Sequence, residues 1–208
     1  AATARGILVT NVPDYCRHEV AEHALAMILA WTRRLHDFER AILDGRYDRA
    51  PAAGVRRLAG RTLGIVGFGQ IGAALAEKAS ALGLRILVTG RTPKPTPAGV
   101  QWCSFDEVLT NCDFLSLHLP LTDDTRHLID ADALARMPSH AYLINTSRGA
   151  IVDQQALAVA LNRGEIAGAA LDVQDPEPPD LTAPPFDDPR VIVTPHVAFS
   201  SVESVDEL

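Results

Sequence analysis

Residues 63–95 read LGIVGFGQIGAALAEKASALGLRILVTGRTPKP, and this stretch decides the fold. A short apolar run leads into Gly67, Gly69 and Gly72, spaced as G-x-G-x-x-G, and an alanine-rich segment typical of a helix follows. In that context the first glycine permits a tight turn, the second lets the backbone approach a pyrophosphate, and the third allows close packing of helix on strand. Amides at the helix start can then bind the phosphates. The stretch predicts a dinucleotide-binding turn, with incidental glycines in an ordinary strand-to-helix turn as the alternative.

The end of the second predicted strand, residues 84–89, indicates which dinucleotide binds. An NAD site usually has Asp or Glu at this point to accept a hydrogen bond from the ribose. Here Gly90 removes the carboxylate that would repel a 2′-phosphate, while Arg91 and Thr92 can donate hydrogen bonds to one. A charge-assisted hydrogen bond of about 1.5–3 kcal/mol corresponds to about a ten- to hundredfold preference. The sequence therefore favours NADP, with NAD possible and a merely solvated basic loop as the alternative.

Composition limits the classes of function. The chain has 208 residues, 47% apolar and 22% charged, with a net charge of −7, so its overall field gives no reason to expect nucleic-acid binding. The apolar run at residues 20–31 is interrupted by Glu22 and His23 and is too short to cross a bilayer. The cysteines have no metal-ligand spacing and suit reduced thiols: Cys16, Cys103 and Cys112. We expect a cytoplasmic protein with no metal site, no membrane segment and no nucleic-acid partner.

Strand-like and helix-like runs alternate along the chain. Strands are expected at residues 6–10, 62–67, 84–89, 113–118, 141–146, 166–172 and 190–194, and helices at residues 17–44, 70–82, 130–137 and 153–163. Asp130 and Asp153 suit helix N-caps, and Gly164 suits a helix end. Five prolines in residues 176–185 predict a long irregular loop. The alternation alone would also allow a closed barrel of strands and helices. The low strand count and the glycine motif favour a Rossmann-type α/β fold, a doubly wound parallel sheet with helices on both faces.

Three polar side chains follow successive predicted strands, at the sheet edge where α/β proteins bind ligands. They are Arg148, Glu177 and His196. Reduction of a 2-oxo acid needs a cation for the carboxylate, which Arg148 can supply, and a proton for the carbonyl oxygen, which His196 can supply. Glu177 could fix the tautomer of the imidazole and stabilise its charged form. Each residue taken singly also has a structural interpretation, as a loop arginine, a loop glutamate or a surface histidine.

Together these motifs resemble the nucleotide-binding domain of the D-isomer-specific 2-hydroxyacid dehydrogenases. The resemblance runs from residue 11 to residue 201 and includes VAEH at residues 20–23 and LHLPLT at residues 117–122. It implies the catalytic roles given above for the arginine, glutamate and histidine, and it implies that Asp172 binds the carboxamide of the cofactor. It also implies cofactor contacts from the glycine turn and from further positions: Gln70, Ile71, His118, Pro120, Thr125 and Thr146.

The resemblance also implies how the chain is divided. Residues 1–12 would be a remnant of a substrate domain, residues 13–201 the dinucleotide-binding domain, and residues 202–208 the start of a returning helix capped by Ser200 and Glu203. Such a piece is expected to be inactive alone. The helix predicted at residues 17–44 is apolar nearly all round, and family members dimerise through this domain, so we expect a homodimer through residues 17–60.

Two stretches bear on the subfamily. Residues 90–92 are similar to NADPH-preferring glyoxylate/hydroxypyruvate reductases, whereas residues 12–16 resemble phosphoglycerate-dehydrogenase-like or corepressor-like members. The expected function is hydride transfer to or from a small 2-oxo or D-2-hydroxy acid, glyoxylate- or hydroxypyruvate-like. The alternative is a dinucleotide-sensing interaction protein of the same fold. The remaining histidines are interpreted as structural: His18, His23, His36, His127 and His140.

Overall fold

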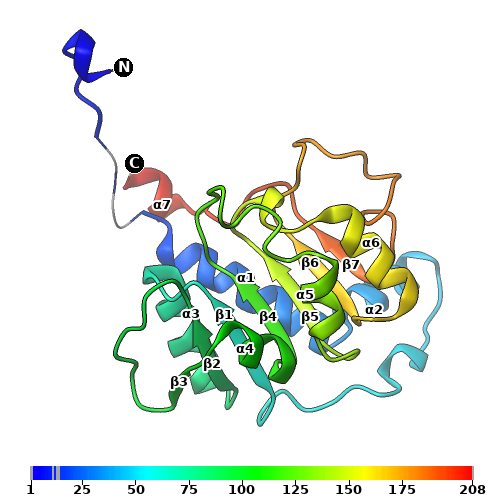
Figure 1. The fold of residues 1–208 in the computed structure, drawn as a ribbon. Coiled ribbons are helices and arrows are strands. Elements are labelled where there is room, and N and C mark those ends of the chain that lie inside the picture. The colour runs from blue at the N-terminus through cyan, green and yellow to red at the C-terminus, as the bar shows by residue number, and fades with distance from the viewer. Residues whose placement is uncertain (1, 11, 13–14, 208) are drawn as a thin grey trace.

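A computed structural model describes residues 2–10, 12 and 15–207 of the chain. Within them, seven parallel strands form one sheet in the order β3-β2-β1-β4-β5-β6-β7 (Figure 1). The strands are β1 (Thr62–Val66), β2 (Arg85–Thr89), β3 (Val100–Trp102), β4 (Phe114–Leu117), β5 (Tyr142–Asn145), β6 (Gly168–Leu171) and β7 (Val191–Val193). The strand order reverses between β1 and β4, which makes their carboxyl ends the switch point where such sheets bind ligands. The predicted Rossmann-type fold is confirmed.

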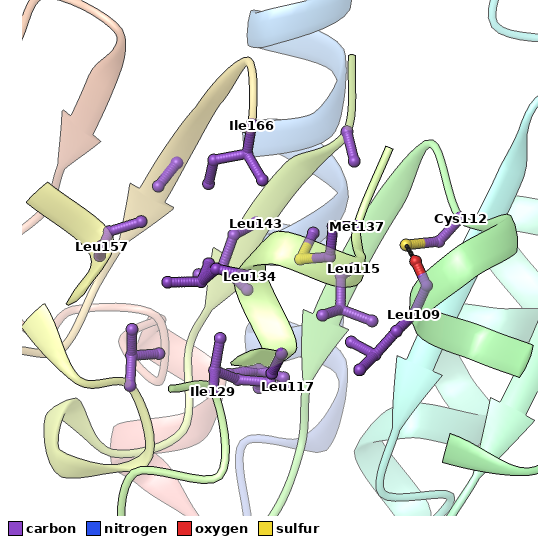
Figure 2. Close-up of a cluster of buried hydrophobic side chains, with 14 of the residues drawn as sticks. Leu109, Cys112, Leu115, Leu117, Ile129, Leu134, Met137, Leu143, Leu157 and Ile166 are labelled. Atoms are coloured by element: carbon purple, nitrogen blue, oxygen red, sulfur yellow. Dashed lines mark hydrogen bonds between the residues drawn. The ribbon is translucent and has the colours of Figure 1, made fainter. Parts of the chain in front are cut away.

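Helices cover both faces of the sheet. On one face lie α1 (Arg17–Thr32) and α3 (Gln70–Ala81), and on the other lie α4 (Phe105–Asn111), α5 (Ala131–Arg136) and α6 (Gln154–Arg163). A hydrophobic core lies on each face, the first beneath α1 and α3 and the second beneath α4, α5 and α6. Side chains alternate between the two faces along each strand, so Leu63 and Ile65 of β1 join the first core and Val66 joins the second. Figure 2 shows the second core, where Leu115 of β4 and Leu143 of β5 lie among side chains such as Leu134 of α5.

Shorter elements complete the chain. They are α2 (Leu35–Leu43), α7 (Val202–Asp206) and the 3-10 turns η1 (Thr3–Arg5), η2 (Ala50–Ala52) and η3 (Gly149–Ile151). The predicted helix boundaries hold where local chemistry sets them. Asp130 accepts a hydrogen bond from the amide of Ala133, Asp153 caps α6, and Gly164 ends α6 in the left-handed conformation. The proline-rich stretch between β6 and β7 has neither helix nor strand among its described residues.

Several predicted elements are wrong or were missed. Residues 6–10 form no strand, because they have no partner strand in the described part of the chain. The helix predicted at residues 17–44 breaks into α1 and α2 at Arg34, whose φ of 56° is left-handed. Residues 100–111 hold β3 and α4, which the strand and helix predictions missed. The last capping box joins Ser201 to Ser204, instead of the predicted Ser200 and Glu203.

Two further expectations concern the motif at residues 12–16 and the absence of a membrane segment. The subfamily motif at residues 12–16 includes Pro13 and Asp14, which lie outside the described residues, as does Asn11 at the start of the resemblance. Among the described residues, the helices are too short or too polar to span a bilayer.

Candidate active site

The glycine turn between β1 and α3 is shaped by close backbone contacts. Gly67 has a φ of +100°, and a Cβ there would overlap the carbonyl oxygen of His118 on the neighbouring strand end. A Cβ on Gly72 would overlap the carbonyl oxygen of Gly67, so both positions require glycine. Gly69 is the N-cap of α3 and has no side chain with which to cap the helix. The start of α3 can therefore hold a phosphate on its backbone amides.

The ribose end of the predicted cofactor site lies at the tip of β2. The strand ends at Thr89, as the sequence predicts, so Gly90 and Arg91 follow directly. A Cβ on Gly90 would lie 3.5 Å from Cη2 of Trp102, an ordinary contact, so packing does not require glycine here. Arg91 and Thr92 are exposed, and neither side chain has a hydrogen-bond or ion-pair partner among the described residues. Their donors are therefore available to a ligand.

A cleft of about 630 Å³ opens at the carboxyl ends of the strands. Its lining brings together seven of the predicted site residues: Ile71, His118, Pro120, Thr146, Arg148, Asp172 and His196. Apolar residues that were not predicted complete the wall, among them Tyr15, Cys16 and Phe199. Glu177 stands outside the lining, behind His196, and Gln70 lines a separate groove beside α3. The strand-end placement thus gathers the predicted arginine and histidine into one cavity.

Arg148 is held at the cleft by the turn after β5. The Asn145 side chain donates to the carbonyl oxygen of Arg148 at 2.9 Å and accepts from the amide of Ser147 at 3.0 Å. Ser147 Oγ donates to the carbonyl oxygen of Leu117 at 2.5 Å, which ties this turn to the end of β4. The guanidinium itself donates to the carbonyl oxygen of Ser147 through Nη1 at 2.6 Å. Its remaining N–H groups suit a bidentate contact with a carboxylate.

His196 and Glu177 form a direct pair. Nδ1 of His196 lies 2.9 Å from Oε2 of Glu177, and Oε1 of Glu177 accepts from the amide of Gln174 at 2.9 Å. Burial raises the pKa of the Glu177 carboxyl, but the hydrogen bonds from His196 and Gln174 outweigh it and leave the pKa below its usual value. An ionised carboxylate only accepts hydrogen bonds, so Nδ1 carries a proton and Nε2 is the atom left for proton exchange.

The loop that carries His196 is fastened to Asp172, which is fully buried. Oδ1 of Asp172 accepts from Thr194 Oγ1 at 2.6 Å and from the amide of Val197 at 3.0 Å, and Oδ2 accepts from the amide of Ala198 at 2.9 Å. The carbonyl oxygen of Asp172 accepts from the amide of His196 at 2.7 Å. These bonds fix the chain on both sides of the histidine. Oδ2 still has capacity for a further donor, such as a carboxamide.

Two polar atoms beside the cleft are buried without a partner among the described residues: Nδ1 of His118 and Oγ1 of Thr146. Nε2 of His118 contacts Ser116 Oγ at 2.9 Å, and burial lowers the pKa of the ring to about 4, so the ring is neutral near pH 7. This favours a binding role over proton donation. Thr125, also predicted to contact the cofactor, uses its hydroxyl within its own loop, donating to the carbonyl oxygen of Pro120 at 2.7 Å.

Sequence reasoning missed two parts of the site. Phe199 stands edge-on to His196, with ring centroids 6.3 Å apart and an interplanar angle of 80°, and its place three residues after the histidine was the available signal. His23 was interpreted as structural, yet its ring reaches the loop of His196 and lies 3.0 Å from Thr194 Oγ1. No local pattern marks that contact, because it joins positions 171 residues apart.

The chain is similar in sequence to a known protein family and to several of its relatives. A family profile described as D-isomer specific 2-hydroxyacid dehydrogenase, NAD binding domain, matches residues 25–198. A glyoxylate reductase from Korarchaeum cryptofilum is 43% identical over 98% of this chain and 63% of its own length. A D-3-phosphoglycerate dehydrogenase from Mycobacterium leprae is 38% identical over 99% of this chain and 39% of its own length.

A solved structure also resembles this chain over nearly its whole length. An acyclic imino acid reductase in complex with NADPH and D-Arg is 30% identical and superimposes with a TM-score of 0.89, over 99% of this chain and 66% of that one. The chain therefore spans less than two thirds of the length of these proteins.

Proposed function

Because the chain belongs to the D-isomer-specific 2-hydroxyacid dehydrogenase family, we propose that it contributes the cofactor site and the proton-transfer pair of an oxidoreductase. The reaction is hydride transfer between a nicotinamide cofactor and a small 2-oxo or D-2-hydroxy acid. The observation that carries the proposal is the 2.9 Å contact between Glu177 and His196, at a cleft that Arg148 and His196 line together.

The bound dinucleotide supplies or removes the hydride. Arg148 grips the carboxylate of the 2-oxo acid, and its charge polarises the carbonyl group beside it. During reduction, the His196 imidazolium gives its Nε2 proton to the carbonyl oxygen and keeps the Nδ1 proton that faces Glu177. In the reverse direction, Nε2 of neutral His196 accepts the hydroxyl proton. The Glu177 carboxylate stabilises the imidazolium and holds the ring in the required orientation.

The cofactor proposal is a preference for NADPH over NADH. Gly90 offers no carboxylate to repel a 2′-phosphate, and Arg91 and Thr92 have donors free of partners among the described residues. The acyclic imino acid reductase that is 30% identical to this chain was solved with NADPH, which supports a site for the phosphorylated cofactor. We further propose that the adenosine ribose lies at the tip of β2 and the pyrophosphate at the start of α3, with Gln70 and Ile71 on its path.

The proposed substrate class is a glyoxylate- or hydroxypyruvate-like acid, supported by the similarity to a glyoxylate reductase. The test is steady-state turnover of the full-length protein with glyoxylate, hydroxypyruvate and pyruvate, each with NADPH and NADH. Arg148→Gln should raise KM for the acid and lower kcat, since it loses the cation that binds and polarises the substrate. Arg163→Gln is the matched control, because Arg163 lies exposed at the end of α6.

A different outcome of that assay would favour the other function. If the full-length protein binds the dinucleotide tightly but turns over none of the acids, the oxidoreductase proposal fails. A dinucleotide-sensing interaction protein would then be the better description, with the redox state of the cofactor controlling a partner.

The partner proposal is a homodimer through residues 17–60, the region of α1, α2 and the arm that follows them. Four large apolar side chains in this region are exposed: Leu35, Ile42, Leu43 and Tyr47. Of the α2 residues that the structure describes, only Ala41 is fully covered, so the helix leaves most of its apolar surface to solvent. Covering such a surface with a second copy is favourable, and a two-fold arrangement would place the same patch on both sides.

A further inference from the structure

His23 is an imidazole of the fold that the proposed reaction does not use. It lies in the second turn of α1, and its side chain is 24% exposed. Nε2 of His23 lies 3.0 Å from Oγ1 of Thr194 and 3.6 Å from Oδ1 of Asp172. The first is a hydrogen-bond contact and the second is a longer electrostatic contact, and both reach residues that fasten the loop of His196.

The direction of these hydrogen bonds follows from the number of protons available. Thr194 has one hydroxyl proton, and it goes to Oδ1 of Asp172 over 2.6 Å. Oγ1 of Thr194 can therefore only accept from His23, which requires that Nε2 of His23 carry a proton. A continuous series of donors thus runs from His23 through Thr194 to Asp172.

The same series ends at the backbone of His196. Asp172 holds the amides of Val197 and Ala198 through its carboxylate, and its carbonyl oxygen holds the amide of His196. His196 has a φ of 55°, a left-handed conformation that residues with a Cβ seldom adopt. The bonds on both sides of it keep the ring where Nδ1 meets Glu177.

We propose that His23 is a positioning residue of the active site, which holds the proton donor His196 in place through Thr194 and Asp172. This inference rests on the proposed function for its kinetic consequence. His23 is absent from the described lining of the cleft, so it acts on the reaction only through these neighbours. Loss of its N–H frees Thr194 to turn, weakens the hold on Asp172 and lets the His196 loop shift.

The first test compares variants of the full-length protein. His23→Met fills a similar space, favours a helix and has no donor, whereas His23→Gln keeps an N–H donor. His23→Met should lower kcat about ten- to a hundredfold with a smaller change in KM, since small misplacements of a reacting group reduce turnover on this scale. His23→Gln should recover most of the loss. His140→Met is the control. His140 precedes β5 and contacts Asp113, which precedes β4, at 3.2 Å, so the pair lies at the amino ends of the strands, opposite the cleft.

A double-mutant cycle tests the route. Thr194→Val removes the hydroxyl that links His23 to Asp172. If the effect passes through Thr194, the double variant His23→Met/Thr194→Val loses no more kcat than the worse single variant. Losses that add independently, or a His23→Met variant that melts earlier but keeps its kcat, would overturn the proposal.

A second readout needs no turnover. Against the opposing effect of burial, the hydrogen bond from His196 holds the pKa of the Glu177 carboxyl below its usual value. In His23→Met the shifted ring weakens that bond, so the pKa of Glu177, followed by the chemical shift of its carboxyl carbon, should rise. If the protein turned over none of the acids tested, the proposed reaction would be rejected. The titration of Glu177 would still decide whether His23 positions His196. A Glu177 titration identical in His23→Met and the parent protein would rule the role out.

Discussion

Cofactor preference gives the sharpest test of the strand end at Thr89. The double substitution Gly90→Asp/Arg91→Ala should shift the cofactor preference of the site from NADPH toward NADH. The new carboxylate has room, because a Cβ at position 90 would lie 3.5 Å from Cη2 of Trp102 and 3.8 Å from the amide nitrogen of Phe68, both ordinary contacts. The backbone at Gly90 does not have a positive φ, so aspartate adds no strain there.

The size of the change follows from two interactions with the 2′-phosphate. Arg91 has no competing anion among the described residues, so its loss removes a charge-assisted hydrogen bond of about 1.5–3 kcal/mol. Because Arg91 is exposed, solvent screening favours the lower end of that range. Repulsion between the aspartate and a phosphate about 4 Å away adds about 1 kcal/mol in water-like surroundings. The preference should therefore shift by about 1.5–3 kcal/mol, or about ten- to a hundredfold.

The assay is the dissociation constant of each reduced cofactor, measured from its fluorescence on binding to the parent and variant proteins. Arg85→Ala is the control, because Arg85 is exposed at the start of the same strand, far from the tip. High salt should weaken the preference of the parent protein for NADPH, as expected for an exposed ion pair. A parent protein that binds both cofactors equally, or NADH more tightly, would refute the reasoning from residues 90–92.

Other predictions concern the proton donor, the glycine turn and the assembly. His196→Ala should lower kcat about a hundredfold or more, and unchanged turnover would remove it as the acid. Burial raises the pKa of Glu177, but its hydrogen bonds lower it by more, so the net pKa lies below the usual value. The contribution of Glu177 to stability should therefore be present above the ordinary glutamate pKa and lost only as pH falls through the lowered value. The check is the melting temperature measured against pH. If the melting temperature of Glu177→Gln fell at acid pH in the same way as that of the parent protein, this prediction would be contradicted. Gly72→Ala should lower the free energy of unfolding by about 1–3 kcal/mol through its overlap with Gly67, whereas Gly69→Ala, which has open space, should keep its melting temperature and bind cofactor less tightly. Light scattering at micromolar concentration should show a dimer that Ile42→Asp dissociates, and a monomeric parent would contradict the interface.

The sequence by itself determined the features whose physical cause is local. The spacing of the three glycines, the strand end at Thr89 and the caps at Asp130 and Asp153 each depend on a few consecutive residues. The alternation of buried strands with helices then specified a parallel sheet, and parallel strands bring their carboxyl ends to one edge. For that reason the meeting of Glu177 with His196 could be expected before the structure was known.

Local patterns also misled where the outcome depended on a distant partner. Residues 6–10 have strand-like composition, but a strand needs a neighbour to pair with, and none is present in the described chain. The apolar pattern continues across Arg34, yet the chain turns there into α2. The short strand β3 is only three residues long, so its pairing with β2 was not evident in its composition, although Ser104 and Glu107 did carry the capping signal of α4.

Only the tertiary structure decided what surrounds the proton donor. Packing of α1 on the sheet brings His23 to Thr194 and Asp172, and hydrogen-bond direction then follows from the single proton of the threonine hydroxyl. His196, whose backbone is left-handed, likewise donates its amide to the carbonyl oxygen of Asp172, which lies 24 positions earlier by residue number. Spacing along a chain specifies which groups one element presents, whereas the contacts between elements depend on how their buried faces fit together.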